Sequence, residues 1–180
     1  ILHMDIIIIG SGNTATVMGR KIVSAGYRIV QVYSPHQAHA EALASTLQAQ
    51  PVTDMGKIER KADLVLLAVS DNTYETVIRE LPPTDAFLVH TAGSIPMDIL
   101  KDTGRRYGVL YPLQSLRREP EAIPEFPLLI DANGPENLEA LKEIAERLSK
   151  TVIHANDEMR LKYHLGAVLV NNFTNHLFAL

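Results

Sequence analysis

Small residues that could hold a phosphate stand near the start of the chain. Residues 10–15 read Gly-Ser-Gly-Asn-Thr-Ala, the spacing G-x-G-x-x-G/A, directly after four isoleucines at 6–9. The first glycine permits a tight turn, the second lets backbone N–H groups approach a pyrophosphate, and the alanine lets a helix pack close to a sheet. The helix N-terminus adds free N–H groups and partial positive charge. We expect a dinucleotide to bind at Gly10, Ser11, Gly12, Asn13, Thr14 and Ala15; a tight turn without a ligand is the alternative.

The end of the second apolar run bears on which dinucleotide binds. Residues 28–33 (RIVQVY) lead into Ser34-Pro35-His36, with no Asp or Glu to accept from the ribose 2′-hydroxyl of NAD. Ser34 could donate to a 2′-phosphate, and His36 could do so when protonated or in the suitable tautomer. The sequence therefore favours NADP over NAD, although this loop contains no arginine.

Two later apolar runs also end in small or polar residues. Residues 63–69 (DLVLLAV) precede Ser70-Asp71-Asn72, and residues 86–90 (AFLVH) precede Thr91-Ala92-Gly93-Ser94. Ligands of open α/β sheets bind at the carboxyl ends of the strands. Further cofactor-binding candidates are therefore Val69, Ser70, Asp71, Thr91, Ala92 and Gly93. The alternatives are helix capping by Asp71 or Asn72 and a plain turn at 91–94.

A polar stripe interrupts the apolar C-terminal segment. His164 and Asn171 are seven residues apart, so on a helix they share one face. Hydride reduction of a carbonyl or imine needs a proton near neutral pH, which histidine can deliver. We expect His164 to be the catalytic proton donor and Asn171 or Asn172 to orient the substrate. Hydrogen bonding between helices, or a solvated stripe, is the alternative.

Alternating strands and helices are expected to position these residues. Strands are expected at 6–9, 28–33, 51–53, 63–69, 86–90, 107–111, 128–130 and 151–154, and helices at 14–25, 37–48, 73–81 and 135–150, with a short helical link at 56–61. This order predicts an α/β fold with a Rossmann-type, doubly wound, mostly parallel sheet. Residues 1–155 would form the NAD(P)-binding domain.

The last segment differs in character. With Asp157 as its N-cap, residues 158–180 are expected to form one long helix that is apolar on most faces. We interpret 156–180 as the first helix of an incomplete C-terminal helical domain. Either further chain or a second protein chain would cover it.

Composition excludes several classes of function. The 180 residues carry a formal net charge of −4 and no cysteine, so disulfides and thiolate sites are absent and neither nucleic acid nor a membrane is an expected partner. There is no apolar stretch of membrane-spanning length and no signal peptide, so a cytoplasmic location is expected. His36 and His39 lack a third ligand, and no metal site is predicted.

Five motifs in the same order resemble a known family. They are GSGNTA, LLAVSDN, VHTAGS, LYPLQSL and KYHLGAVLVNN. The chain resembles the Rossmann-like proteins with a C-terminal DUF2520 domain, relatives of pyrroline-5-carboxylate reductase and of deazaflavin-dependent NADP oxidoreductases. The resemblance implies an NADP-binding domain, then a helical domain like the C-terminal fold of 6-phosphogluconate dehydrogenase, and a homodimer formed through those helices. Tyr163-His164 followed by Asn172 matches the family's YH…N pattern, whereas most of the helical domain is lacking.

These observations lead to one expected function and two alternatives. We expect an NADP-dependent oxidoreductase that transfers hydride to or from a small carbonyl, imine or alcohol compound. A non-catalytic NAD(P)-binding module, acting as a redox sensor or assembly subunit, would need the glycine turn but no proton donor. A methyltransferase is disfavoured because the acid that usually binds the ribose hydroxyls is missing after residue 33.

Overall fold

An eight-stranded sheet forms the centre of the molecule. The computed structural model describes residues 4–117 and 122–177, with only the backbone described for 171–177. The strands are β1 (Asp5–Ile9), β2 (Arg28–Tyr33), β3 (Gln50–Val52), β4 (Leu64–Leu67), β5 (Phe87–His90), β6 (Tyr107–Pro112), β7 (Leu128–Ala132) and β8 (Val152–His154). Their order is β3-β2-β1-β4-β5-β6-β7-β8, and only the β6–β7 pair is antiparallel. The order reverses between β1 and β4, where open sheets bind ligands.

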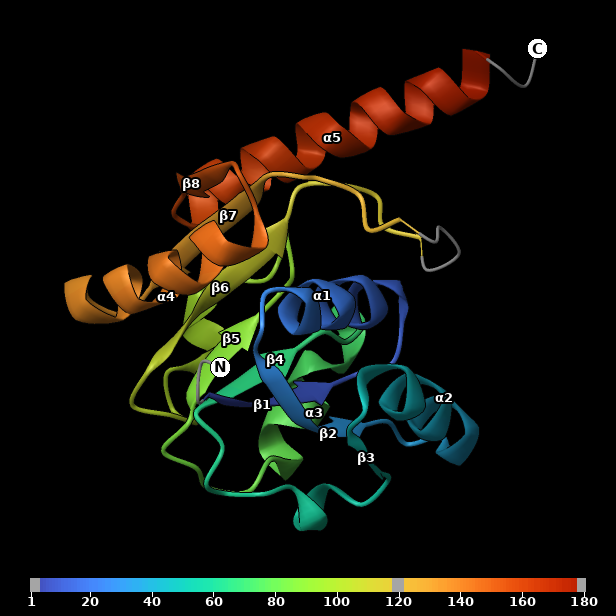
Figure 1. The fold of residues 1–180 in the computed structure, drawn as a ribbon. Coiled ribbons are helices and arrows are strands. Elements are labelled where there is room, and N and C mark those ends of the chain that lie inside the picture. Colours follow the sequence, from blue (N-terminus) through green and yellow to red (C-terminus); the bar gives the residue numbers. More distant parts are fainter. Residues whose placement is uncertain (1–3, 118–121, 178–180) are drawn as a thin grey trace.

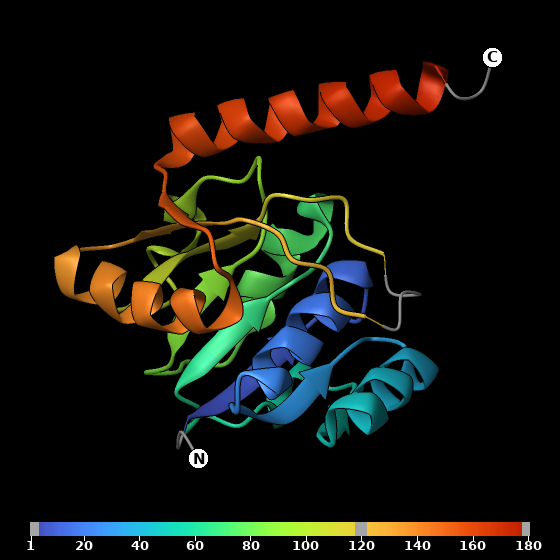
Figure 2. The same cartoon turned by 45° about the horizontal axis from the view of Figure 1, so that its top comes forward.

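Helices cover both faces of this sheet (Figure 1). The helices α1 (Asn13–Ser24), α2 (Gln37–Leu47) and α4 (Pro135–Leu148) pack on one face. The other face is covered by α3 (Tyr74–Glu80) and by the short 3-10 helices η1 (Met55–Lys57) and η3 (Met97–Leu100); a third, η2 (Asp71–Thr73), precedes α3. The long helix α5 (Asp157–Leu177) runs across the top of the domain (Figure 2).

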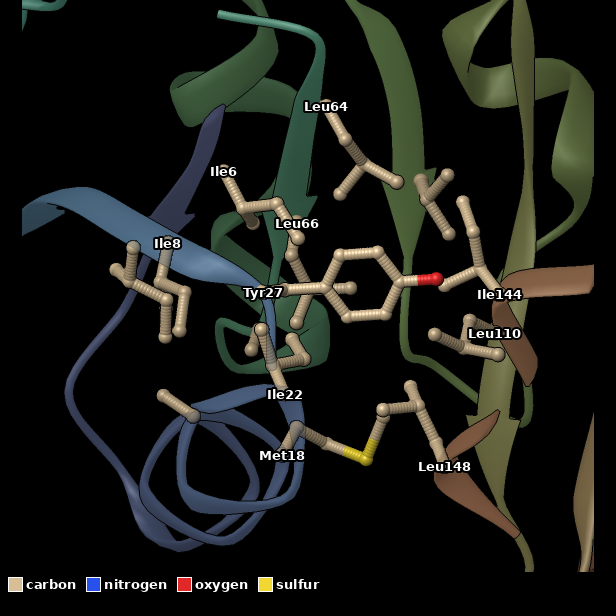
Figure 3. Close-up of a cluster of buried hydrophobic side chains, with 14 of the residues drawn as sticks. Ile6, Ile8, Met18, Ile22, Tyr27, Leu64, Leu66, Leu110, Ile144 and Leu148 are labelled. Carbon is tan, nitrogen blue, oxygen red and sulfur yellow. The ribbon is translucent and has the colours of Figure 1, made fainter. Parts of the chain in front are cut away.

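Alternating strand residues supply the two layers of the core. Ile6 and Ile8 belong to the cluster beneath α1 and α4, where the Tyr27 ring lies between strands and helices (Figure 3). Ile7 and Ile9 belong to the cluster on the other face. All four isoleucines are completely buried, and each such side chain stabilises the fold by about 1.5–3 kcal/mol. This burial on both faces explains why the run has no polar alternation.

The fold class predicted from the sequence is confirmed, with differences at the ends of elements. The third predicted helix begins later, at Tyr74, because residues 71–73 form the 3-10 turn η2. The predicted link at 56–61 shortens to three helical residues, at 55–57. Asp157 is not the N-cap of the last helix: Asn156 Oδ1 accepts from the backbone N–H of Met159, 3.0 Å away. Asn156 precedes the first helical residue and therefore takes the capping role.

The helix α5 leaves many apolar side chains exposed. Leu165, Leu169 and Val170 are 52%, 69% and 68% exposed. The predicted division at residue 155 and the predicted homodimer through this helix stay predictions. In the described ranges, no helix has both the length and the apolar character that crossing a membrane requires.

Candidate functional site

The glycine turn between β1 and α1 is fixed by its backbone. Gly10 has a φ of +121°, and a Cβ there would lie 2.2 Å from the carbonyl oxygen of Ala68, so only glycine fits. Gly12 is the N-cap residue of α1, and a Cβ there would meet no atom within 4 Å. The described first turn of α1 contains no acidic residue and no side chain caps it. Its N–H groups therefore remain available to an anion beside an open backbone.

A cavity of about 390 Å³ lies in front of this turn. It is lined by Gly10, Ser11, Gly12, Asn13, Thr14, Ser34, Pro35, His36, His39, Ala68, Val69, Ser70 and Thr73. The cavity thus brings together most of the cofactor-binding residues expected from the sequence. Ala15 is completely buried and packs in the core, so it does not line the cavity. The open cradle fits the pyrophosphate of a dinucleotide.

The far end of the cavity is built from serine and histidine. Ser34 is buried, and the Ser11 hydroxyl donates to the Ser34 hydroxyl over 3.0 Å. The backbone N–H of His36 points to the same oxygen at 3.4 Å. The rings of His36 and His39 stand edge to face with centroids 5.3 Å apart. His39 was not predicted as a binding residue, although its spacing of three from His36 at a helix start was the available signal.

A second group of residues gathers under α5. The Oη atom of Tyr111 and the Nδ1 atom of His164 are 2.8 Å apart and share a hydrogen bond. Their rings meet edge to face with centroids 5.7 Å apart. Gly93 lies directly beneath: a Cβ there would be 2.5 Å from His164 Nδ1 and 2.9 Å from Tyr111 Cζ. Residue 93 must therefore be small, because the His164 side chain occupies the space above it.

Asp71 and Ser94 border this group. The Ser94 hydroxyl donates to Asp71 Oδ2 over 2.5 Å, joining the loops that follow β4 and β5. The alternative that Asp71 or Asn72 caps a helix is wrong, because no side chain caps η2 or α3. Burial, reinforced by the charge on Asp71, raises the pKa of Tyr111. The phenol therefore stays protonated and can act as a hydrogen-bond donor.

The remaining predicted residues divide into two groups. Thr91 and Ala92 are buried, and the Thr91 hydroxyl donates to the carbonyl oxygen of Leu67 over 3.2 Å. Their side chains support the turn, and only backbone atoms remain for a ligand. The side chains of Asn171 and Asn172 lie outside the described part of the structure. The catalytic and cofactor-binding roles assigned to individual residues stay predictions.

A buried arginine that the sequence analysis missed attaches α5 to the sheet. Arg160 is 1% exposed, and its Nη2 atom donates to the carbonyl oxygen of Ile95 over 2.6 Å and to Asp157 over 2.7 Å. Asp157 also accepts from the backbone N–H of Met97 at 3.0 Å. Burial, and then the charge on Arg160, lower the pKa of the neighbouring His90 to about 3. The acid and arginine three residues apart were the signal for this anchor.

A mostly apolar hollow of about 900 Å³ lies between the loop at 113–115 and the segment of α5 from Met159 to Val170. His164 does not line this hollow. Over the described ranges, no three His, Asp or Glu side chains are grouped so that they could hold a metal ion.

The sheet order, the glycine turn and the open cradle define a Rossmann-type dinucleotide-binding protein. Residues 5–92 match a family described as NADP oxidoreductase, coenzyme F420-dependent, and residues 126–180 match a domain of unknown function, DUF2520. The chain is 36% identical to a candidate NADP oxidoreductase from Bacteroides fragilis, with a TM-score of 0.88, covering 98% of this chain and 70% of that one. The protein belongs to the Rossmann-like family with a C-terminal DUF2520 domain.

More distant structures share the fold. A protein from Thermotoga maritima is 24% identical with a TM-score of 0.76, covering 96% of this chain and 66% of that one. A pyrroline-5-carboxylate reductase from Streptococcus pyogenes is 14% identical with a TM-score of 0.69, covering 86% and 59%. The chain thus spans about two thirds of the length of these relatives. No protein of curated function matches it significantly.

Proposed function

We propose that this protein is an NADP-dependent oxidoreductase that transfers hydride to or from a small carbonyl, imine or alcohol compound. The family and the structural neighbours support an NAD(P)-dependent oxidoreductase. The preference for NADP, the substrate class and the roles of single residues are our proposal. They rest on the chemistry of the cradle and of the residues under α5.

The observation that carries the proposal is the placement of a histidine at the carboxyl edge of the sheet. His164 stands over Gly93, after β5, while the phosphate cradle lies after β1, and β4 separates these two strands. A dinucleotide held by its pyrophosphate at Gly10–Thr14 would extend along this edge toward His164. Bound NADPH would supply the hydride. The protein would orient the acceptor and provide the accompanying proton.

The hydrogen bond to Tyr111 favours one arrangement of the His164 protons. A protonated phenol can donate to Nδ1, and the ring proton of a neutral imidazole then lies on Nε2. The raised pKa of Tyr111 keeps the phenol protonated, which supports this direction of donation to the neutral ring. After the ring takes up a second proton, Nδ1–H would face the phenol oxygen, and Nε2 would deliver its proton to the developing alkoxide or amine and leave a neutral imidazole. Tyr111 would act as a positioning residue and His164 as the general acid.

The first experiment tests cofactor binding. Purified protein would be titrated with NADPH and with NADH, followed by nicotinamide fluorescence, alongside Gly12→Asp and Gly12→Asn. Both side chains fit the open space at this position and both favour an N-cap, so the variants should fold equally well. They differ in charge alone. We expect Gly12→Asp to bind NADPH at least about tenfold more weakly than Gly12→Asn, because a carboxylate repels the pyrophosphate.

The second experiment separates an enzyme from a redox sensor. His164→Gln keeps a polar side chain but cannot serve as a general acid. We expect turnover of small ketones or imines to fall at least about 100-fold while the Kd for NADPH changes less than about threefold. A sensor would show no turnover in either form. Failure of both nucleotides to bind the wild-type protein would overturn the proposed function.

A further inference from the structure

The Asp71 carboxylate lies outside the phosphate cradle. Its neighbours Ser70 and Thr73 line the cavity of the cradle, whereas Asp71 does not. Asp71 is exposed, and its Oδ2 atom accepts from the Ser94 hydroxyl, so the carboxylate reaches from the loop after β4 to the loop after β5. Asp71 was predicted from the sequence to bind the cofactor, but this bond places its carboxylate beside the residues that surround His164.

Ser94 brings the carboxylate to the proposed reaction site. It follows Gly93, where a Cβ would lie 2.5 Å from His164 Nδ1. The charge also acts on Tyr111, the hydrogen-bond partner of His164, because burial and then the charge on Asp71 raise the pKa of this phenol. A substrate that takes a proton from His164 would therefore lie within electrostatic reach of Asp71.

No basic side chain pairs with this carboxylate in the part of the chain that the structure describes. The cations on α5 have acidic partners on the same helix: Arg160 pairs with Asp157, and Lys162 pairs with Glu158. The charge on Arg160 acts on the pKa of Tyr111 in the opposite sense to Asp71, and more weakly. The carboxylate therefore leaves a negative potential at this part of the sheet edge.

We propose that Asp71 selects a substrate with an ammonium group close to the reacting carbon, so that the enzyme interconverts a small amino ketone and the corresponding amino alcohol. The inference rests on the proposed function and names its substrate class. An exposed carboxylate attracts a cation and repels a carboxylate or phosphate at the same distance. Ser94 binds Oδ2 and holds the Asp71 side chain in place, and Oδ1 can accept from an N–H of the ammonium group.

The ammonium group is separate from the group that is reduced. Reduction breaks the C=O π bond: the carbonyl carbon accepts the hydride of NADPH, and the carbonyl oxygen accepts the proton of His164. The products are the amino alcohol and NADP+, and the ammonium group keeps its charge. A protonated imine beside Asp71 would already carry the proton that His164 supplies. A proton donor and a carboxylate at one site therefore favour an amino ketone over an imine.

The test uses three small alcohols of similar size and different charge: isopropanolamine, sec-butanol and lactate. Each is titrated into protein saturated with NADPH, where no reaction can occur, and nicotinamide fluorescence gives the Kd near neutral pH and at low ionic strength. We expect isopropanolamine to bind about three- to fivefold more tightly than sec-butanol, and lactate to bind more weakly by a similar factor, as one charge pair near the surface allows. Raising the ionic strength to about 0.5 M should reduce both differences.

Asp71→Asn removes the charge and keeps an acceptor for the Ser94 hydroxyl. This variant should bind isopropanolamine about three- to fivefold more weakly than the wild type and lactate more tightly by a similar factor. The Kd values for sec-butanol and NADPH should stay within about twofold of wild type, which also shows that the variant folds. Asp85→Asn is the matched control. Asp85 is exposed and precedes β5, at the opposite edge of the sheet from Ser94, so all wild-type Kd values should persist.

Three outcomes would contradict these expectations. Unchanged Kd values for the charged alcohols in Asp71→Asn, or no binding of isopropanolamine to the wild type below about 0.1 M, would overturn the inference and leave the oxidoreductase assignment standing. A changed ratio of the Kd values for NADP+ and NADPH in Asp71→Asn, with the alcohols unaffected, would assign the carboxylate to the charge of the nicotinamide ring and also overturn it. Failure of both NADPH and NADH to bind the wild type would instead reject the proposed function.

Discussion

Oη of Tyr111 lies 2.8 Å from Nδ1 of His164, across 53 residues of sequence. This contact joins β6 to α5, and the Arg160 anchor holds the first turn of the same helix. The position of His164 over the sheet edge is therefore set by two attachments, one polar contact to a strand and one buried cation. Changes to either attachment should alter the geometry of the edge without disturbing the phosphate cradle.

Tyr111→Phe should slow catalysis while leaving cofactor binding intact. The substitution keeps the ring against His164 and removes one hydrogen bond, worth about 0.5–1.5 kcal/mol. We expect kcat to fall about three- to tenfold, with the Kd for NADPH within about twofold of wild type. The pH profile of kcat should also shift, because His164 loses the partner that fixes its tautomer. Steady-state kinetics with a ketone or imine that the enzyme reduces would measure both effects.

A neighbouring tyrosine offers the control. Tyr107 lies on the same strand, and its hydroxyl donates to Asp98 over 3.3 Å at the surface. Tyr107→Phe should leave kcat and its pH profile unchanged. If the two variants have the same kinetics, Tyr111 does not position the acid.

Gly93→Ala should displace His164. The added methyl group would lie 2.5 Å from Nδ1, well inside van der Waals contact, so the imidazole or the loop must move. A misplacement of about 1 Å can reduce a rate about 100-fold. We therefore expect loss of turnover with a Tm close to wild type. Gly166→Ala is the control, since a Cβ there meets nothing within 4 Å and alanine favours a helix.

The sequence predicted the sheet because its signals are local. Uninterrupted apolar runs such as 6–9 and 64–67 are buried on both faces, and glycine ends the first of them where the chain must turn. Residue 157 shows the limit of the same reasoning. Both Asn156 and Asp157 are residue types that favour an N-cap. Asp157 instead lies inside the helix, where its carboxylate binds Arg160, and Asn156 caps the helix.

The phosphate cradle was predictable because its residues follow each strand directly. The group under α5 was only half predictable, since Gly93 and His164 stand out as residue types while Tyr111 reads as an ordinary strand residue. Its hydroxyl has a partner only because α5 packs above β6 and places His164 beside it. Asp71 likewise has the character of a helix cap, yet the approach of Ser94 from the next loop provides a better partner.

His90→Asn should make the protein less sensitive to acid. The folded pKa of His90, about 3, lies below the value of about 6.5 in an unfolded chain. The folded state therefore resists protonation: this stabilisation is complete above about pH 6.5 and is lost as pH falls toward 3. Asn retains an acceptor for the Ala92 N–H, which bonds to His90 Nδ1 at 3.2 Å, but cannot titrate.

The measurement is urea unfolding at pH 7, 5.5 and 4.5. As the pH falls, the free energy of unfolding of the wild type should decrease by up to about 1.4 kcal/mol per pH unit through His90. The contribution of the carboxylates is common to both proteins and adds to this decrease. His154→Asn, at an exposed position, should follow the wild-type curve. Parallel curves for wild type and His90→Asn would show that the pKa of His90 does not fall on folding.

Arg160→Ala should loosen the attachment of α5 far more than the matching change at Lys162. Arg160 is buried and donates to Ile95 and Asp157, so alanine leaves a cavity and two acceptors without this donor. Because Asp157 is half exposed, solvent offsets part of the loss, and we expect about 2–4 kcal/mol of destabilisation. Lys162 pairs with Glu158 in solvent, and its truncation should cost less than about 0.5 kcal/mol.

Hydrogen exchange separates local from global effects of the Arg160 change. If Arg160 anchors the helix, amides in the described part of α5 should exchange faster in Arg160→Ala. The exchange rates of amides in β1 and β4 should change only as far as the global stability of the protein changes. Turnover should fall together with α5 protection, because His164 lies one turn beyond Arg160, and NADPH affinity should persist because the cradle is built on β1 and α1. Equal protection of α5 in the Arg160 and Lys162 variants would show that Arg160 does not anchor the helix.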